Sequence, residues 1–214
     1  MSDAKRLLAA FEGSRAAYGT TVVGRVGRNG KTESNSRVIH GQLDEEKIQA
    51  HIDGELGVGS IPINSENVCK FGALDIDTYD LDLQALNRKV QAMKMPLILC
   101  RSKSGGAHLF LFLKDWEPAA LIREYLTEMS IALGYSGCEI FPKQDKILAE
   151  RGDVGNFINM PYYGGDITTR YAMDKDGEAV DFDKFFKMVN AKRVSAAELN
   201  EMKFGGKRKY FTDG

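Results

Sequence analysis

Cysteine and histidine are scarce in this sequence, and long apolar runs are missing. The 214 residues contain 3 Cys and 3 His, scattered and without a CxxC pair, so a structural zinc site is not expected. No apolar run approaches the ~20 residues that a membrane span needs, and the N-terminus MSDAKRLLAAFEG lacks a signal-peptide pattern. Unpaired cysteines are typical of a reducing compartment, so the sequence predicts a cytoplasmic protein with no membrane partner.

Excess charge of either sign is also missing. The chain has 29 Lys and Arg against 30 Asp and Glu, a formal net charge of -1. This balance excludes a basic coat held on nucleic acid by bulk electrostatics, so any contact with a polyanion must come from local patches. With 43% hydrophobic and 28% charged residues, the composition is that of a soluble globular protein with a sizeable core.

Residues 71–141 carry the clearest structural pattern. The segments FGALDID, LILCR, AHLFLFL and CEIF predict four strands, and amphipathic stretches after the first and third of them predict two helices. This order is that of the ferredoxin-like (RRM-like) βαββαβ unit, in which the fourth strand lies beside the first. We therefore predict an α+β fold, with this unit as the catalytic core and an N-terminal α/β extension before it.

The flanking segments complete the predicted domain organisation. DAKRLLAAFEGSRAAYG spaces its apolar residues, Ala17 and Tyr18 included, on one side of a predicted helix, and a Gly- and Arg-rich stretch follows with strands at its ends. We predict one domain over residues 1–175, divided into an N-terminal part (1–70) and the RRM-like part (71–175). Residues 176–214 are predicted to form a helical appendage with a basic tail.

Strand alternation predicts where the polar side chains of the core meet. Leucines and isoleucines of the first and third strands share one face and should pack under the two helices. The opposite face carries Phe110 and Phe112 together with four polar residues at one end of the sheet. These four are Asp75, Asp77, His108 and Glu139.

Such a cluster is suited to metal binding. Carboxylates a few ångströms apart repel one another unless a cation lies between them. Oxygen ligands favour Mg²⁺ or Mn²⁺, and a pair of such ions suits in-line displacement at phosphorus. Asp75, Asp77 and Glu139 are therefore candidate ligands of two ions in a phosphoryl-transfer site. The alternative is an aspartate pair that caps the turn after its strand, helped by Thr78 and Asp80.

The segment RSKSGGAH predicts a phosphate-binding turn beside these acids. Its hydroxyls, ammonium and backbone N–H groups are a natural cradle for a triphosphate, and His108 could donate a hydrogen bond to a phosphate oxygen. Lys143, just beyond the fourth strand, could neutralise the nucleotide or lie in a solvated loop. The alternative for the turn is a hairpin whose glycines only supply positive φ. The candidate nucleotide-binding residues are Ser102, Lys103, Ser104, Gly105, Gly106 and Lys143.

With these motifs, the chain resembles the archaeo-eukaryotic primase superfamily, the primase–polymerases of phages, plasmids and bacterial conflict systems. LDID is similar to its hydrophobic-DxD motif, SGGAH to its small-x-His motif and CEIFPKQD to its third acidic motif. The resemblance implies a DNA primase or primase–polymerase, a metal-dependent nucleotidyltransferase acting in replication. Asp75 and Asp77 would be metal ligands and His108 would contact the phosphates, whereas Glu139 stands where many members have Asp.

The resemblance also implies partners. They are a single-stranded DNA template, an NTP or dNTP and a replicative helicase, in a prokaryotic cell or a phage-infected host. A basic edge at Arg25, Arg28, Lys31 and Arg37 would contact the template, or would be a solvated hairpin. Two other functions stay open: a repair, gap-filling or terminal-transfer polymerase of the same superfamily, and a non-catalytic RRM-like single-strand binder. In the binder, Phe110 and Phe112 would stack on bases.

Overall fold

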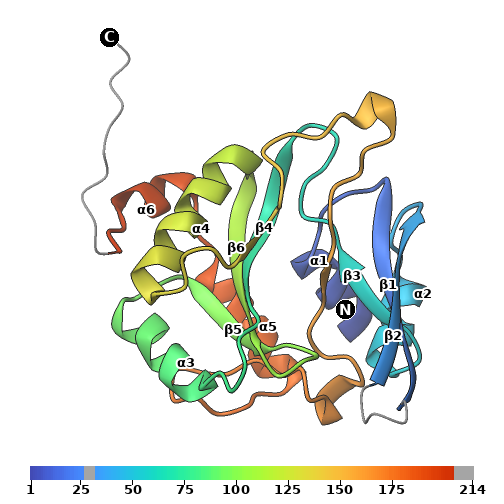
Figure 1. The fold of residues 1–214 in the computed structure, drawn as a ribbon, viewed down its shortest axis with the longest axis horizontal. Coiled ribbons are helices and arrows are strands. Elements are labelled where there is room, and N and C mark those ends of the chain that lie inside the picture. Colours follow the sequence, from blue (N-terminus) through green and yellow to red (C-terminus); the bar gives the residue numbers. More distant parts are fainter. Residues whose placement is uncertain (27–31, 205–214) are drawn as a thin grey trace.

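Within residues 1–26 and 32–204, which a computed structural model describes, the strands form two four-stranded antiparallel sheets (Figure 1). The N-terminal sheet has the strand order β2-β1-β3-β8, and the second sheet has the order β5-β6-β4-β7. The strands are β1 (Ala17–Val26), β2 (Thr32–His40), β3 (Gly57–Ser60), β4 (Val68–Ile76), β5 (Leu97–Arg101), β6 (Ala107–Pro118), β7 (Glu139–Phe141) and β8 (Ile158–Asn159). The helices are α1 (Asp3–Ala10), α2 (Glu45–Ile52), α3 (Leu83–Ala92), α4 (Ala119–Leu133), α5 (Phe182–Lys192) and α6 (Ala196–Glu201), with short 3-10 turns η1 (Ala149–Arg151) and η2 (Gly165–Ile167).

The second sheet confirms the predicted ferredoxin-like unit. Its central strands β4 and β6 are the first and third strands of the unit, and β7, the fourth, pairs with β4. Helices α3 and α4 cover one face, on the side away from the N-terminal sheet (Figure 1). On that face Leu74 and Leu109 pack with Leu86 of α3 and Leu126 of α4 in one buried cluster. The aliphatic alternation of the strands is therefore the reason why the helices lie on this side.

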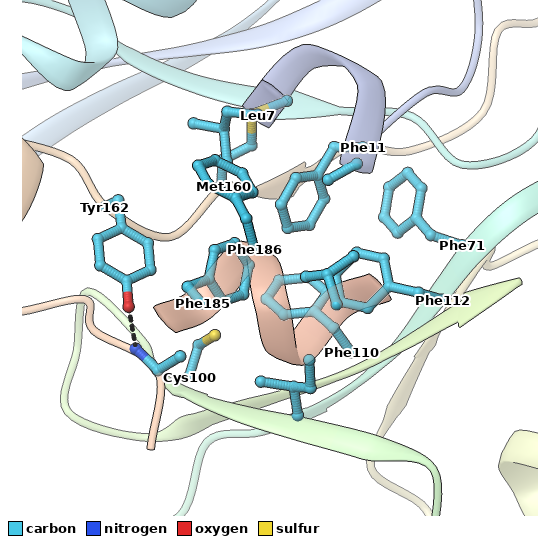
Figure 2. Close-up of a cluster of buried hydrophobic side chains, with 14 of the residues drawn as sticks. Leu7, Phe11, Phe71, Cys100, Phe110, Phe112, Met160, Tyr162, Phe185 and Phe186 are labelled. Carbon is cyan, nitrogen blue, oxygen red and sulfur yellow. Dashed lines mark hydrogen bonds between the residues drawn. The ribbon is translucent and has the colours of Figure 1, made fainter. Parts of the chain in front are cut away.

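The other face of the same sheet is covered as well, which argues against the alternative in which Phe110 and Phe112 stack on bases. Phe110 and Phe112 are 0% exposed, and the ring of Phe11 meets each of them edge-on at centroid distances of 5.0 and 5.4 Å. Phe185 of α5 packs against Phe112 from the other end of the chain (Figure 2). These aromatic rings therefore form a core and offer no surface on which bases could stack.

The prediction that the first helix continues to Ala17 and Tyr18 is wrong. Helix α1 ends at Ala10, and Ala17 opens β1. The amide of Ser14 donates to the carbonyl of Ile61 at 2.8 Å, and Gly13 lies so close to that carbonyl that a Cβ would clash with it. The chain is therefore tied to the segment after β3 and leaves the helical path.

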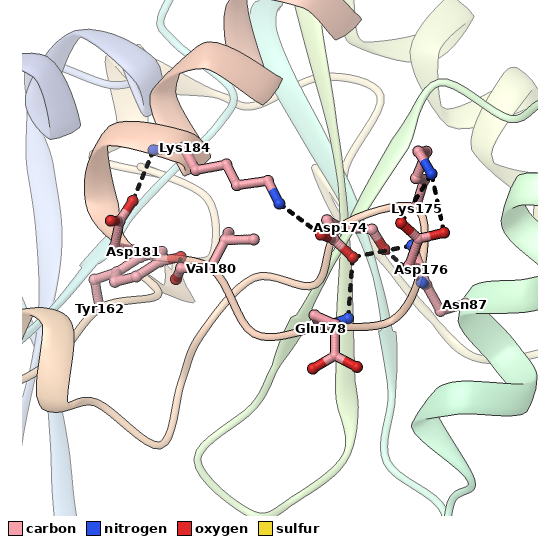
Figure 3. A network of polar contacts seen from close by, with 9 residues as sticks. All are labelled: Asn87, Tyr162, Asp174, Lys175, Asp176, Glu178, Val180, Asp181 and Lys184. Atoms are coloured by element: carbon pink, nitrogen blue, oxygen red, sulfur yellow. Dashed lines mark hydrogen bonds and ion pairs between the residues drawn. The ribbon is translucent and has the colours of Figure 1, made fainter.

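A polar network holds the segment after η2 against the second sheet (Figure 3). One oxygen of Asp174 accepts from the amides of Asp176 and Glu178 at 2.9 and 3.0 Å, and the other accepts from Lys184 of α5 at 2.6 Å. Asn87 of α3 donates to the backbone carbonyl of Asp174 at 2.8 Å. These bonds join the segment to two helices, and an isolated bridge between Ala172 and Cys100 sets it beside β5.

The predicted boundary between residues 175 and 176 stays a prediction, although α5 contributes Phe185, Phe186 and Val189 to the same cluster as Phe110. A capping box formed by Ser195 and Glu198 begins α6. None of the helices in the described part of the chain is both long and apolar enough to cross a membrane.

Candidate active site

The strand register brings three polar residues together at one end of the second sheet. Asp75 is the direct partner of His108 on β6 and of Glu139 on β7. Residues directly opposite in antiparallel strands point to the same face, so these side chains form one row across the sheet. The row lies on the face away from α3 and α4, at the edge of the aromatic core.

His108 and Asp75 form the inner part of this row. His108 is 9% exposed, and its Nε2 lies 3.5 Å from an Asp75 oxygen. The His108 ring also meets Phe110 edge-on at 5.8 Å, so the core fixes one side of the imidazole. A carboxylate beside an imidazole orients the ring. The side chain of Asp75 is 24% exposed and is therefore open to a ligand.

Asp77 lies beyond the end of β4 and meets the SKSGG turn. Ser104 donates its hydroxyl hydrogen to Asp77 at 3.1 Å, and the hydroxyls of Ser102 and Ser104 are 3.2 Å apart. The turn closes with the amide of Ser102 donating to the Gly106 carbonyl at 2.9 Å. The predicted phosphate-binding turn and the acidic strand end are thus joined by a side-chain hydrogen bond.

Two positions of the turn require glycine, each for a different structural reason. Gly105 has φ +90°, a conformation that L side chains rarely adopt. Gly106 lies against β4, where a Cβ would stand 2.5 Å from the carbonyl oxygen of Ile76. The expectation that a glycine supplies positive φ holds for Gly105, and Gly106 provides close approach between the turn and Asp77.

Glu139 and Lys143 are engaged with each other. Lys143 Nζ donates to a Glu139 oxygen at 3.0 Å, and the Glu139 side chain is 57% exposed. The lysine predicted to neutralise a nucleotide therefore neutralises the third acid of the row. This pair uses one oxygen of Glu139 and one N–H of Lys143, so the roles predicted for them, metal ligand and phosphate contact, stay predictions.

The side chains at this end of the second sheet have the donor atoms that a divalent ion requires. Carboxylate oxygens with one nearby imidazole are a donor set suited to Mg²⁺ or Mn²⁺. Across residues 1–26 and 32–204, however, no three His, Cys, Asp or Glu side chains stand close enough to hold a metal. Asp75 and Asp77 are the residues that would hold an ion, and Glu139, which is paired with Lys143, lies opposite Asp75 as the third candidate.

Two basic residues that the sequence did not mark as site residues, Arg101 and Arg170, lie near the turn. Arg101, the last residue of β5, donates to the Thr169 carbonyl at 3.2 Å. Arg170 is 5% exposed, and its guanidinium lies 4.6 Å from the centre of the Tyr163 ring. Arg101 could have been found from its place before the turn. No sequence signal marks Arg170, because long-range pairing with β5 brings it here.

The predicted basic edge is only partly described. Arg37 is exposed on β2. Arg28 and Lys31 lie outside the described residues, as do the side chain of Arg25 and the basic tail from residue 205 onward. A template-binding role for these residues stays a prediction.

Comparison with known proteins identifies the family of this chain. Residues 17–202 match the family described as the TOTE conflict system, archaeo-eukaryotic primase domain. The chain belongs to this family. The match covers both sheets and most of the chain, and it confirms the resemblance seen in the LDID, SGGAH and CEIFPKQD motifs. A search of curated proteins finds no match.

Membership in the archaeo-eukaryotic primase family supports a nucleotidyltransferase or primase-like role for the chain. The mixed α+β architecture with two antiparallel sheets is consistent with such a domain.

Proposed function

We propose that this primase-family domain is a DNA primase or primase–polymerase, which joins nucleotides in the order set by a single-stranded DNA template. The observation that carries the proposal is the register of the second sheet, in which Asp75 stands directly opposite both His108 and Glu139. An acidic strand end joined by a hydrogen bond to a Ser- and Gly-containing turn is a combination suited to a triphosphate and its cation.

In the proposed reaction a 3′-hydroxyl oxygen forms a bond to the α-phosphorus, and diphosphate leaves. Asp75 and Asp77 would hold a divalent ion, which would neutralise phosphate charge when bound. His108 would donate from its ring nitrogen to a phosphate oxygen, a hydrogen bond that strengthens as charge develops there. The nearby Asp75 carboxylate would orient this donor, and the buried side of the ring limits its motion.

The Ser102–Gly106 turn would bind the phosphates at the same time. Its amides and hydroxyls are donors, and the Ser104 hydroxyl already meets Asp77. Correct placement of the reacting groups is itself a large part of catalysis in nucleotidyl transfer. Residues of the turn would therefore affect nucleotide binding and rate together.

The test is nucleotide incorporation on labelled primer–template and on unprimed single-stranded DNA, with NTPs or dNTPs and with Mg²⁺ or Mn²⁺. We expect Asp75→Ala/Asp77→Ala to abolish incorporation and leave the circular dichroism spectrum unchanged. His108→Ala should lower kcat/KM for the nucleotide by about 100-fold, because it removes one donor to the phosphates. His108→Asn retains an N–H donor and should lose less.

A matched control is the double variant Asp115→Ala/Glu117→Ala. These residues are also acids separated by one position, and they lie near the opposite end of β6. Their replacement should leave incorporation near the wild-type level. Incorporation by Asp75→Ala/Asp77→Ala at the wild-type rate would refute the proposed site. Extension of primers without unprimed synthesis would favour a repair or gap-filling polymerase.

A further inference from the structure

Arg170 is a buried cation that forms no ion pair with a carboxylate of the described residues. The residue is 5% exposed, and its Nη1 is buried with no hydrogen-bond acceptor among the described residues. Burial lowers the pKa of Arg170, against a smaller opposite effect of the Tyr163 side chain. A buried, unpaired charge is costly, so a structure that retains one usually has a reason for it.

The backbone around Arg170 is held firmly beside the phosphate-binding turn. The Arg170 carbonyl accepts from the amide of Tyr162 at 3.0 Å, and the amide of Arg101 donates to the Tyr171 carbonyl at 2.9 Å. Arg101 is the last residue before the turn, so Arg170 lies near its entrance. The ring of Tyr163 contacts the guanidinium and restricts its position.

Lys103, inside the turn, is a second cation without an acidic partner. No hydrogen bond or ion pair of its side chain is found in the described part of the chain. Partial burial lowers the pKa of Lys103, and repulsion from the positive charge of Arg170 lowers it further. The Arg101 guanidinium adds a third positive charge, since a Cβ on Gly105 would stand 3.3 Å from it.

We propose that Arg170 and Lys103 form a site for the terminal phosphates of the nucleoside triphosphate, beside the phosphate-binding turn. The inference rests on the proposed function and names the residues that would bind the polyphosphate. An anion there would supply the acceptor that Arg170 Nη1 lacks and would relieve the repulsion between the two cations. Arg170 takes the role predicted for Lys143, which is paired with Glu139.

The experiment measures binding of inorganic tripolyphosphate to the full chain by calorimetry, with EDTA present so that no metal contributes. We expect tripolyphosphate to bind more tightly than monophosphate. Arg170→Gln and Lys103→Gln should each weaken tripolyphosphate binding by about 10- to 100-fold. Arg170→Lys should fall between wild type and Arg170→Gln, because it keeps the charge and loses the planar fork.

Two matched controls test whether the loss is specific. Arg193 and Lys192 are also partly buried cations, but Arg193 already donates to the Leu113 carbonyl at 3.0 Å. Arg193→Gln and Lys192→Gln should bind tripolyphosphate as the wild type does. In the absence of ligand, Arg170→Met should melt at or above the wild-type temperature, since it removes an uncompensated charge. A purely structural Arg170 would give a lower melting temperature with unchanged tripolyphosphate affinity.

Failure of this inference can be told apart from failure of the proposed function. Unchanged tripolyphosphate affinity in Arg170→Gln and Lys103→Gln would overturn the inference, while incorporation by the wild type would still support the polymerase. A wild type that incorporates no nucleotide but shows Arg170-dependent binding would refute the polymerase and retain the anion site.

Discussion

Acidification should destabilise this protein through one buried histidine, His51 of α2. Its side chain is 0% exposed, its Nδ1 accepts from the amide of Val58 at 2.9 Å, and its Nε2 donates to the carbonyl of Pro161 at 2.8 Å. Both bonds together require the neutral ring with hydrogen on Nε2. Protonation of Nδ1 would break the bond to Val58, which joins α2 to β3.

The size of the effect follows from the pKa. Burial lowers the pKa of His51 from 6.5 to about 4, and the positive charge of Arg170 acts in the same direction. The unfolded chain therefore takes up a proton at a higher pH than the folded one. The contribution of His51 to stability is fully present above pH 6.5 and is lost as the pH falls towards 4. A difference of two to three pKa units between the folded and unfolded states amounts to about 3 kcal/mol. This is a large part of the free energy of unfolding of a typical protein, about 5–15 kcal/mol.

Urea unfolding between pH 7.5 and pH 4 measures this loss, with His51→Gln as the non-titrating reference. Carboxylates contribute equally to both proteins, so the difference in free energy of unfolding between wild type and variant isolates His51. This difference should shrink by about 3 kcal/mol on acidification. His40→Gln, at an exposed position of β2, is the control and should show no such change. A constant difference, or a His51 NMR signal that titrates near pH 6.5, would contradict the reasoning.

Three further substitutions test the packing around the site. Gly106→Ala should reduce nucleotide incorporation, measured on primer–template, because a Cβ would stand 2.5 Å from the Ile76 carbonyl oxygen and push the turn away. Tyr162→Phe should lower the free energy of unfolding in urea by about 1–3 kcal/mol, because its buried hydroxyl donates to the Val180 carbonyl at 2.7 Å. Phe110→Ala should lower it by about 3–5 kcal/mol, since a fully buried ring is lost from the core. An unchanged urea midpoint in either of the last two would show that the contact contributes little.

The βαββαβ unit could be predicted from the sequence because its determinants are local. Alternation in FGALDID and AHLFLFL assigns one face to aliphatic residues, and the helices between strands follow from spacing alone. The connection rules for such units then determine the sheet order, which the pairing of β7 with β4 confirms. The meeting of Asp75, His108 and Glu139 at one end follows from that order.

The covered aromatic face could not be predicted, because its cover comes from distant segments. Phe11 and Phe185 lie near opposite ends of the chain, and no local pattern links either of them to Phe110. The place of Arg170 depends likewise on an isolated bridge between Ala172 and Cys100. The pairing of Lys143 with Glu139 is between residues only four positions apart in the sequence. It could still not be predicted, because the contact depends on the direction in which the chain leaves β7.

The aromatic core also bears on the chemistry at the rim. His108 and Phe110 are two positions apart on β6 and therefore lie on the same face. The row of Asp75, His108 and Glu139 is thus next to buried apolar rings, which exclude water from that side. A charge at such an edge interacts more strongly with its neighbours than a charge in open solvent, because the local dielectric constant is lower. The segments that bury Phe110 therefore do more than stabilise the fold. Phe11 and Phe185 pack on that face and help to exclude water from the apolar side of Asp75 and His108. The electrostatics of this end of the sheet therefore depend on segments far from the LDID and SGGAH motifs.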